Sequence, residues 1–214
     1  MLTLHGTGVV GGIAFGKIQL FRQAEPKVKR YTVENPESEL KRLDSAIQIA
    51  KQQLQQLYDK ALDEVGETNA LIFEIHQMML EEPDYNLSIR NIIQAQQANA
   101  EYAIAVSSTN FANMFQSMDD EYMRARAVDI RDVSNRLIAA LGGEGPSQPQ
   151  VESGAVLMAE DLTPSQTVQL EKDKIQAFVT RAGTANSHTA ILARMMNLPA
   201  VVAVESEFPD WFHG

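Results

Sequence analysis

The sequence of residues 155–204 is AVLMAEDLTPSQTVQLEKDKIQAFVTRAGTANSHTAILARMMNLPAVVAV. Short apolar runs at residues 155–159, 175–180 and 199–204 are typical of buried strands. Two short helices are predicted between them. One follows the capping box that begins at Thr163 and extends to about Leu170, and the other covers residues 189–196. This alternation of strands and helices predicts a small α/β domain.

The N-terminal stretch also has an extended pattern, over residues 9–21, with glycines placed for turns. Its simplest partner is the same sheet, so the helical region between the two parts would be an insertion. We therefore expect a discontinuous α/β domain over residues 1–25 and 146–214, and a helical domain over residues 31–141. Only ten residues follow Val204, and we expect the α/β domain to be truncated at this end.

The helical region begins with Asn35 as a predicted N-cap and Pro36 at the first helical position. Its first helix carries a heptad seam and places Lys41, Arg42, Lys51, Gln52 and Asp59 outside. The seam comprises Leu40, Leu43, Ile47, Ala50, Leu54, Leu57 and Ala61. Further helices are predicted over residues 69–82, 85–94, 100–118 and 119–141, with Asp119, Asp120 and Glu121 in the last helix's first turn. Residues 142–150, which begin with two glycines, form a predicted linker.

The net charge and the absent residue types exclude several classes of protein. The chain has 18 Lys and Arg against 28 Asp and Glu, a formal net charge of −10, which disfavours nucleic acids and anionic membrane surfaces as partners. Cysteine is absent, which excludes disulfides and thiolate nucleophiles. No apolar run approaches the length of a membrane span, and no secretory signal is visible. We expect a cytoplasmic protein.

The four histidines occupy different sequence settings. His5 and His213 lie near the termini, where chance is the default explanation. His76 lies inside a predicted helix without a second metal ligand nearby, which favours a structural role.

His188 lies where a predicted strand, a loop of small polar residues and a helix N-terminus meet. Such an N-terminus attracts phosphate, and a neutral imidazole is a competent nucleophile near pH 7. Backbone N–H groups, the hydroxyls of Ser187 and Thr189, and Arg194 are candidates to bind a phosphoryl group. The alternative is that His188 only caps the helix.

Seven short segments, distributed from the start to the end of the chain, carry a resemblance to a known family. In order, they are GIAFGK at residues 12–17, IFEIH at 72–76, DEY at 120–122, AVDIRD at 127–132, DLTPS at 161–165, SHTAILAR at 187–194 and LPAVV at 198–202. Together they resemble enzyme I of the bacterial sugar phosphotransferase system, the phosphoenolpyruvate–protein phosphotransferase family.

The resemblance implies a swivelling phosphohistidine α/β domain with an inserted domain of antiparallel helical hairpins. It implies that His188 carries a phosphoryl group, that the Thr167 hydroxyl orients its imidazole, and that the helical domain docks a histidine phosphocarrier protein. The region over residues 31–140 has a net charge of −9, from nine basic and eighteen acidic residues, which suits a basic partner surface. No cofactor is expected in this chain. A separate C-terminal domain would bind phosphoenolpyruvate and magnesium and dimerise.

The chain departs from the family pattern at several positions. Residues 183–186 are Gly-Thr-Ala-Asn, where the family usually has Gly-Gly and then commonly Arg-Thr, and Ala203 replaces an expected glycine. One alternative is therefore a catalytically degenerate binding or regulatory module that uses its helical region. A second is the swivelling phosphohistidine domain of a dikinase, although the helical insertion and the Ser-His-Thr triplet favour enzyme I.

Overall fold

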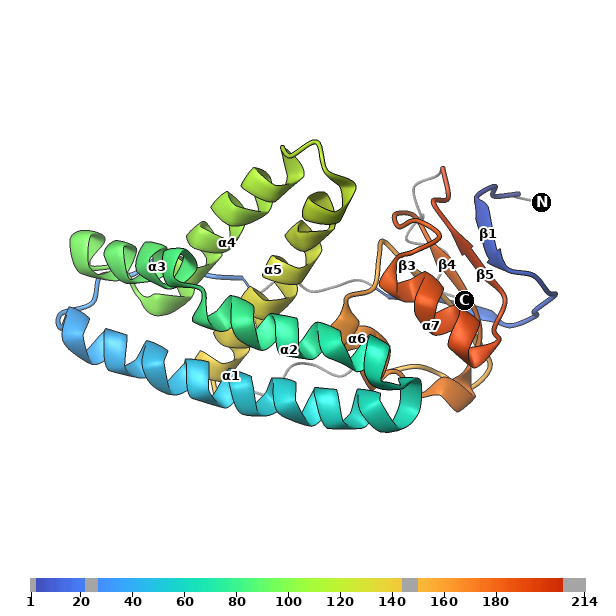
Figure 1. Cartoon of the computed structure of the whole chain (residues 1–214), viewed down its shortest axis with the longest axis horizontal. Coiled ribbons are helices and arrows are strands. Elements are labelled where there is room, and N and C mark those ends of the chain that lie inside the picture. The colour runs from blue at the N-terminus through green and yellow to red at the C-terminus, as the bar shows by residue number, and fades with distance from the viewer. Residues whose placement is uncertain (1–2, 22–26, 144–149, 206–214) are drawn as a thin grey trace. The chain divides into compact units, whose positions relative to one another are not determined.

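The computed structural model describes residues 3–21, 27–143 and 150–205. The chain divides into two compact units (Figure 1). Residues 25–147 form one, called the helical unit below, and residues 1–24 and 148–214 form the other, called the α/β unit. The predicted fold class is confirmed: a helical region is inserted into a chain that otherwise forms a small mixed sheet with helices.

The helical unit consists of antiparallel hairpins. Its helices are α1 (Pro36–Val65), α2 (Glu67–Glu81), α3 (Pro83–Gln96), α4 (Ala100–Gln116) and α5 (Glu121–Leu141). Figure 1 shows α1 and α2 running in opposite directions beside each other, as do α4 and α5. Gly66 alone joins α1 to α2, with φ of +81°. A glycine adopts this left-handed backbone without the steric penalty that a side chain would add.

Helix α1 forms as the sequence predicts. The Asn35 side chain accepts a hydrogen bond from the Ser38 N–H at 3.1 Å, and Pro36 occupies the first helical position. Every residue of the predicted heptad seam is buried. The seam therefore forms the face of α1 that packs against the other helices of the unit.

Three helix starts in the helical unit differ from the prediction by two residues; one is that of α2, which begins at Glu67. The last helix begins at Glu121, because the Asp120 side chain is its N-cap and accepts the Met123 N–H at 3.1 Å. Asp119 and Asp120 therefore precede the helix. Pro83 does more than end α2: it begins α3, two residues earlier than expected, because proline has no N–H that the first turn would leave unpaired.

Arg42 was expected on the solvent face of α1 but is part-buried in a polar cluster. Its guanidinium bonds the Glu39 carboxylate at 2.7 Å and that of Glu101 at 2.8 Å, and it reaches the Leu141 carbonyl at 3.4 Å. Glu39 also accepts the Ala100 N–H at 2.7 Å. This cluster ties the start of α1 to the start of α4 and the end of α5, so it is a structural element of the helical unit.

The α/β unit contains a five-stranded sheet. Its elements are β1 (Thr7–Val10), β2 (Lys17–Phe21), β3 (Ala155–Ala159), α6 (Pro164–Gln169), a 3-10 turn η1 (Lys172–Lys174), β4 (Ile175–Thr180), α7 (His188–Met196) and β5 (Ala200–Val202). The strand order is β1-β5-β4-β3-β2. Strands β2 to β5 are parallel, and β1 is antiparallel to β5. The predicted return of the N-terminal stretch to the sheet is confirmed, since β2 and β1 form its two edges.

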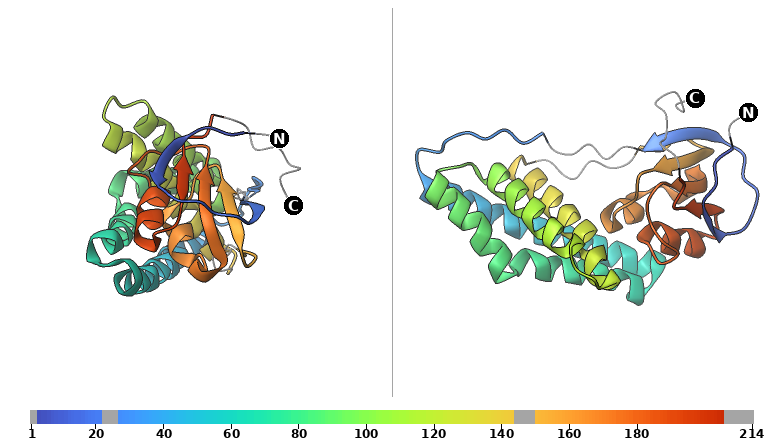
Figure 2. Two further views of the ribbon diagram at one scale, coloured as in Figure 1. Left: turned by 90° about the vertical axis from the view of Figure 1, so that its right-hand side faces the viewer. Right: turned by 90° about the horizontal axis from the view of Figure 1, so that it is seen from above.

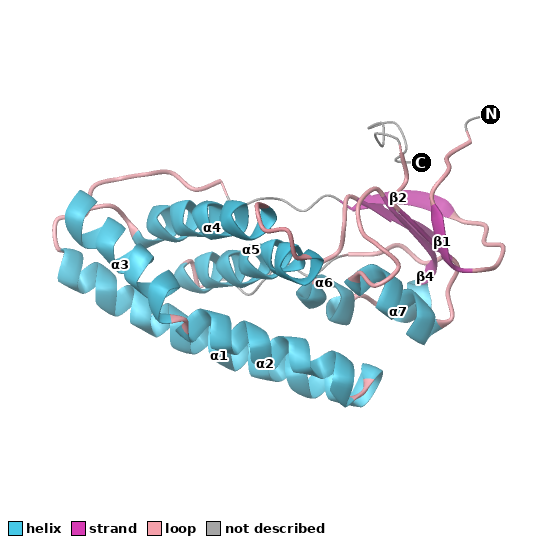
Figure 3. Ribbon diagram, turned by 45° about the horizontal axis from the view of Figure 1, so that its top comes forward, coloured by secondary structure: helices cyan, strands magenta, loops and turns pink. Residues whose placement is uncertain are grey.

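Helices α6 and α7 pack together beside the sheet (Figures 2 and 3). The strands, α7 and the connecting segments all contribute to the core, whose buried members are Val151, Ala155, Leu157, Ala159, Leu162, Leu170, Ile175, Phe178, Leu192, Ala193 and Ala200. Each of the two helices follows a parallel strand. Their N-termini therefore lie at the edge of the sheet where β3 and β4 end.

Candidate functional site

Two loops meet at this edge of the sheet, one after β3 and one after β4. The Arg181 N–H donates to the Ala159 carbonyl at 3.1 Å, and the Ala182 N–H donates to the Glu160 carbonyl at 2.7 Å. The Arg181 guanidinium also pairs with the Glu160 carboxylate at 2.6 Å. These contacts extend the strand pairing beyond the sheet and fix the start of the loop that leads to α7.

His188 is the first residue of α7 and is half-buried. Ser187 is the N-cap: its hydroxyl accepts the Ala190 N–H at 3.4 Å, and its carbonyl accepts the Ile191 N–H at 3.0 Å. The imidazole thus stands at a helix N-terminus on the carboxyl edge of a parallel sheet. Unpaired backbone N–H groups and the positive end of the helix dipole favour an anion at such a place.

The loop before His188 depends on one glycine and one threonine. Gly183 has φ of +100°, and a Cβ there would lie 3.0 Å from the Ser187 hydroxyl oxygen. The Thr184 hydroxyl accepts the Asn186 N–H at 3.2 Å, and its carbonyl accepts the Ser187 N–H at 3.1 Å. Thr184, which departs from the family pattern, therefore stabilises the turn that leads to the N-cap.

Thr189 was predicted to contact phosphate, but its side chain is fully buried. Its hydroxyl donates to the Asp161 carboxylate at 3.4 Å. That carboxylate also accepts the Leu162 N–H at 2.8 Å. Burial raises the pKa of Asp161, although the Leu162 N–H and the neighbouring charge of His188 oppose the shift.

The other two predicted site residues lie on different helices at different distances from the loop. Thr167 is buried in α6, and its hydroxyl donates to the Pro164 carbonyl at 2.8 Å. Its oxygen keeps lone pairs that can accept another hydrogen bond. Arg194 is exposed in the last turn of α7. It follows His188 by six positions in the helix, a rise of about 9 Å, so the backbone does not bring Arg194 to the N-terminal end.

Asp161 is the site residue that sequence reasoning missed. Its sequence position was visible, since it follows a predicted strand within the DLTPS segment. Its contact with Thr189, 28 positions later, is formed only by the fold. The sequence signal for Asp161 was therefore weak: it is an acidic residue directly after a buried strand, on the edge of the sheet where the loop before α7 also lies.

The helical unit contains a second histidine with acidic neighbours. His76 in α2 is completely buried, with its Nε2 3.3 Å from Asp129 and its Nδ1 3.9 Å from Asp132, both on α5. Asp129 also lies 3.5 Å from the Arg126 guanidinium. This enclosed arrangement agrees with the structural role predicted for His76. His5 is exposed, and His213 lies outside the described residues.

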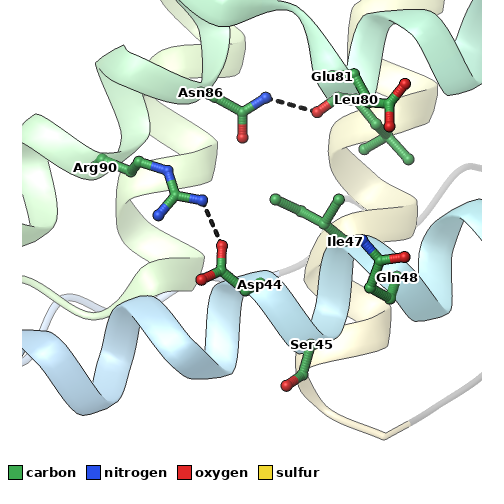
Figure 4. Close-up of a pocket in the computed structure, with 8 residues that line it drawn as sticks. All are labelled: Asp44, Ser45, Ile47, Gln48, Leu80, Glu81, Asn86 and Arg90. Atoms are coloured by element: carbon green, nitrogen blue, oxygen red, sulfur yellow. Dashed lines mark hydrogen bonds and ion pairs between the residues drawn. The ribbon is translucent and has the colours of Figure 1, made fainter.

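A pocket in the helical unit is formed where α1, α2 and α3 meet (Figure 4). The Arg90 guanidinium pairs with the Asp44 carboxylate across it, and the Asn86 amide donates to the Leu80 carbonyl at 2.6 Å. Its lining consists of Asp44, Ser45, Ile47, Gln48, Leu80, Glu81, Asn86 and Arg90. None of these is a predicted site residue, and the Arg90–Asp44 pair links α3 to α1 across the pocket, so the pocket is a gap between packed helices.

Two features are absent from the part of the chain that the structure describes. None of the helices there is long and apolar enough to cross a bilayer. Residues 3–21, 27–143 and 150–205 contain no group of three or more His, Asp or Glu side chains that could hold a metal ion.

Comparisons with protein families and curated sequences cover nearly the whole chain. A family model described as "PEP-utilising enzyme, N-terminal" matches residues 5–126, and one described as "PEP-utilising enzyme, mobile domain" matches residues 151–208. The phosphoenolpyruvate-protein phosphotransferase of Geobacillus stearothermophilus is 39% identical over 205 residues, and that of Bacillus subtilis is 37% identical over 207. These alignments cover 95% and 96% of this chain but 36% of each relative.

Solved structures show the same arrangement of elements. An NMR solution structure of enzyme I (nEIt) superposes with a TM-score of 0.70 and 34% identity, covering 94% of this chain and 83% of that one. The N-terminal domain of "Enzyme 1 - Nitrogen" superposes with a TM-score of 0.63 at 22% identity, covering 99% and 87%. The second likeness concerns the fold alone.

Proposed function

The chain belongs to the PEP-utilising enzyme family and corresponds to the N-terminal part of enzyme I, and from this premise we propose that it carries a phosphoryl group on His188 and exchanges it with a histidine phosphocarrier protein. The observation that carries the proposal is the place of His188, at the N-terminus of α7 on the carboxyl edge of the sheet. An anion is stabilised there, and an imidazole is the nucleophile beside it.

The transfer is a displacement at phosphorus between two imidazoles. A ring nitrogen of His188 attacks the phosphorus of the carrier's phosphohistidine, and a new N–P bond forms. The carrier's N–P bond breaks, and its electron pair returns to the carrier's ring nitrogen. Because both ends of the exchange are phosphoimidazoles, the step is reversible.

Positioning and charge stabilisation supply the catalysis in such a step. The first turn of α7 offers backbone N–H groups to the phosphoryl oxygens, and Ser187 adds a hydroxyl next to them. The Thr167 hydroxyl, whose proton is directed at Pro164, is available to accept the N–H of the imidazole. That bond would leave the lone pair of the other ring nitrogen free to attack.

The carrier would dock on the helical unit, and α2 offers a suitable face. Exposed glutamates and large apolar side chains alternate along one stripe of α2: Glu67, Leu71, Glu74, Met78 and Glu81. Their spacings of four and three place them on one side of the helix. Leu71 is 41% exposed and Met78 is 69% exposed. An acidic stripe with apolar centres fits a basic partner with an apolar contact patch.

The chain spans little more than a third of the length of the curated relatives that it matches. We therefore propose that phosphoenolpyruvate is used by the full-length protein, through a C-terminal part that would bind the substrate and magnesium and form the dimer. Magnesium would supply charge neutralisation at that phosphoryl group when bound. The cytoplasm is the expected compartment, since the carrier and the substrate would be met there.

Incubation with a phosphorylated carrier from the same cell tests the proposal. We expect one acid-labile, alkali-stable phosphate on His188, located by peptide mass spectrometry, and none on the His188→Ala variant. Phosphate on His188→Ala, or phosphate mapped to His76, would contradict the assignment. The 214 residues incubated with phosphoenolpyruvate and magnesium alone should remain unphosphorylated.

Docking is tested by reversing charge on the α2 stripe. The Glu67→Lys/Glu74→Lys variant should bind the carrier with a reduced association rate, and raised salt should weaken binding of the wild type similarly. The Asp59→Lys/Asp63→Lys variant changes the same number of charges on α1 and is the matched control. Equal loss in both variants would mean that net charge, rather than the α2 stripe, attracts the carrier.

A degenerate binding module is the second candidate, and Thr184 and Ala185 at family-divergent positions favour it. This candidate predicts carrier binding without phosphate on His188. A dikinase domain would instead require labelling through a nucleotide-dependent partner. The incubation above therefore separates phosphate transfer from the other two functions, and the docking measurement separates a carrier-binding module from a dikinase domain.

A further inference from the structure

The Asp161 carboxylate contacts the residue that follows His188 and lies close to the loop that precedes it. It accepts the Leu162 N–H at 2.8 Å and the hydroxyl of buried Thr189 at 3.4 Å. A Cβ built on Gly183 would lie 3.7 Å from Asp161 Oδ1 and 3.0 Å from the Ser187 hydroxyl oxygen. The loop before α7 and the residue after His188 are thus both packed around this one side chain.

Asp161 differs from the other charged residues of this region in the partners that it has. Glu160 follows the same strand, but Arg181 pairs with it through both guanidinium and carboxylate contacts at 2.6 and 2.7 Å. Arg194 is exposed at the far end of α7. The partners of Asp161 are neutral donors, an amide and a hydroxyl, and the charge of His188 favours its ionised form.

We propose that Asp161 is a positioning residue for His188: through Thr189 it fixes the first turn of α7, and its negative charge stabilises the cationic imidazole ring that forms as His188 takes the phosphoryl group. The proposal rests on the proposed function of His188 and deepens it. It assigns a role to a carboxylate that was not among the predicted site residues.

A positive charge develops on the imidazole ring of His188 during transfer. When a neutral imidazole attacks phosphorus through one nitrogen, the ring becomes positively charged while its other nitrogen keeps a proton. A carboxylate nearby stabilises that charge, as carboxylates stabilise imidazolium in other enzymes. Because Asp161 is held by Leu162 and Thr189, it does not need to reorganise during the reaction.

The stability of an Asp161 variant distinguishes a positioning role in transfer from a purely structural role. Burial raises the pKa of Asp161, so the folded protein holds the ionised carboxylate at a free-energy cost at neutral pH. An asparagine keeps an oxygen that accepts the same two hydrogen bonds but removes the charge. Asp161→Asn should therefore be at least as stable as the wild type at pH 7 and yet transfer phosphate more slowly. A purely structural aspartate would show a loss of stability instead.

The experiment compares Asp161→Asn with Glu160→Gln in the full chain. With phosphorylated carrier as substrate, we expect kcat for Asp161→Asn to fall about tenfold to a hundredfold, with the carrier's KM unchanged, because docking uses the other unit. Glu160→Gln neutralises the adjacent, paired carboxylate and should leave kcat within about twofold. Equal kcat values for wild type and Asp161→Asn would overturn the proposal while leaving His188 as the carrier of phosphate.

Thr189→Val separates the two contributions of Asp161. This variant keeps the charge of Asp161 but removes the hydroxyl that bonds it, so kcat should fall by less than in Asp161→Asn. Urea denaturation of both variants shows whether the loss of kcat comes with a loss of stability. A kcat that falls only in variants that are also destabilised would overturn the proposal and identify a structural aspartate.

Discussion

Each unit of the molecule places a histidine near an aspartate, but the two pairs have opposite surroundings. In the helical unit, His76 lies 3.3 Å from Asp129 and is completely enclosed between α2 and α5. In the α/β unit, His188 lies half-buried at the N-terminus of α7, and the next residue, Thr189, donates to the Asp161 carboxylate. An enclosed histidine can only hold two helices together, whereas a half-buried histidine at a helix N-terminus can meet an anion.

The arginine ion pairs show the same contrast. Arg42 is part-buried between Glu39 and Glu101 and links three helices of the helical unit. Arg181 pairs with Glu160 on an exposed loop. The buried cluster thus links three helices, whereas the exposed pair joins two neighbouring loops at the edge of the sheet.

Replacement of each histidine by alanine should give the largest difference between the two units. His188→Ala should lose all phosphate labelling, because the nucleophile is gone, while its free energy of unfolding changes by less than about 0.5 kcal/mol. His76→Ala should keep the label on His188 but lose about 3 kcal/mol of stability, since it leaves buried carboxylates without their neighbour. Mass spectrometry and urea denaturation measure the two effects.

Either of two results would contradict this contrast. If His76→Ala lost its label while it stayed folded, the buried pair would have a role in transfer. If His188→Ala unfolded, its imidazole would be part of the core of the α/β unit. A His76→Gln variant serves as a milder check, because an amide can still donate to one carboxylate.

The two regions also differ in how far their sequences predicted them. The seam of α1, from Leu40 to Ala61, is a local pattern, and the structure buries all of it. The strand–helix alternation around His188 is local as well, so the first residue of α7 was predictable within one position. By contrast, Arg42 also pairs with Glu101, 59 positions away, and Asp161 accepts from Thr189, 28 positions away. Such contacts depend on tertiary packing, which periodicity does not encode.

Removing the two arginines is the next largest test. Arg42→Ala should cost about 3 kcal/mol of stability, because Glu39 and Glu101 would remain part-buried without their cation. Arg181→Ala removes an exposed pair and should cost less than about 1 kcal/mol. Thermal or urea unfolding of both variants measures the difference. Equal costs would mean that burial does not distinguish these ion pairs.

The Arg42 cluster also has a pH signature. Burial disfavours the ionised Glu101 carboxylate, but hydrogen bonds from Arg42 and Asn99 outweigh this effect and lower the pKa of Glu101. The stability from this ionised carboxylate is therefore present above the unfolded pKa of about 4.3 and is lost as the pH falls through the folded value. The wild type should lose part of its stability in this acidic range, and Arg42→Ala should lose less.

Two threonines provide a smaller test of the same comparison. Thr167 in α6 donates to the Pro164 carbonyl, and Thr109 in α4 donates to the Ala105 carbonyl at 2.9 Å. Both bonds are local to their helices, but only Thr167 lies in the α/β unit. Thr167→Val should slow transfer from the carrier about tenfold through loss of an orienting acceptor. Thr109→Val should leave the rate unchanged, and equal rates for both variants would remove Thr167 from the mechanism.

The smallest expected effect concerns backbone conformation in the two units. Ala203 follows β5 with φ of +53°, and Gln97 ends α3 with φ of +47°. A left-handed conformation costs a residue with a side chain about 1 kcal/mol or more, whereas glycine adopts it freely but loses more entropy on folding. Ala203→Gly, which restores the residue usual in the family, should therefore stabilise the protein by about 0.5 kcal/mol.

Gln97→Gly should act similarly in the helical unit, because helices often end with glycine in this conformation. Asn197→Gly is the matched control, since Asn197 ends α7 with φ of +51° and asparagine tolerates this region better than alanine or glutamine does. Its change in unfolding free energy should be nearer zero. Should Ala203→Gly destabilise the protein while Gln97→Gly stabilises it, the methyl group of Ala203 would contribute packing that exceeds its backbone strain. The strand end beside the histidine loop would then be held by side-chain contacts, as the helical unit is.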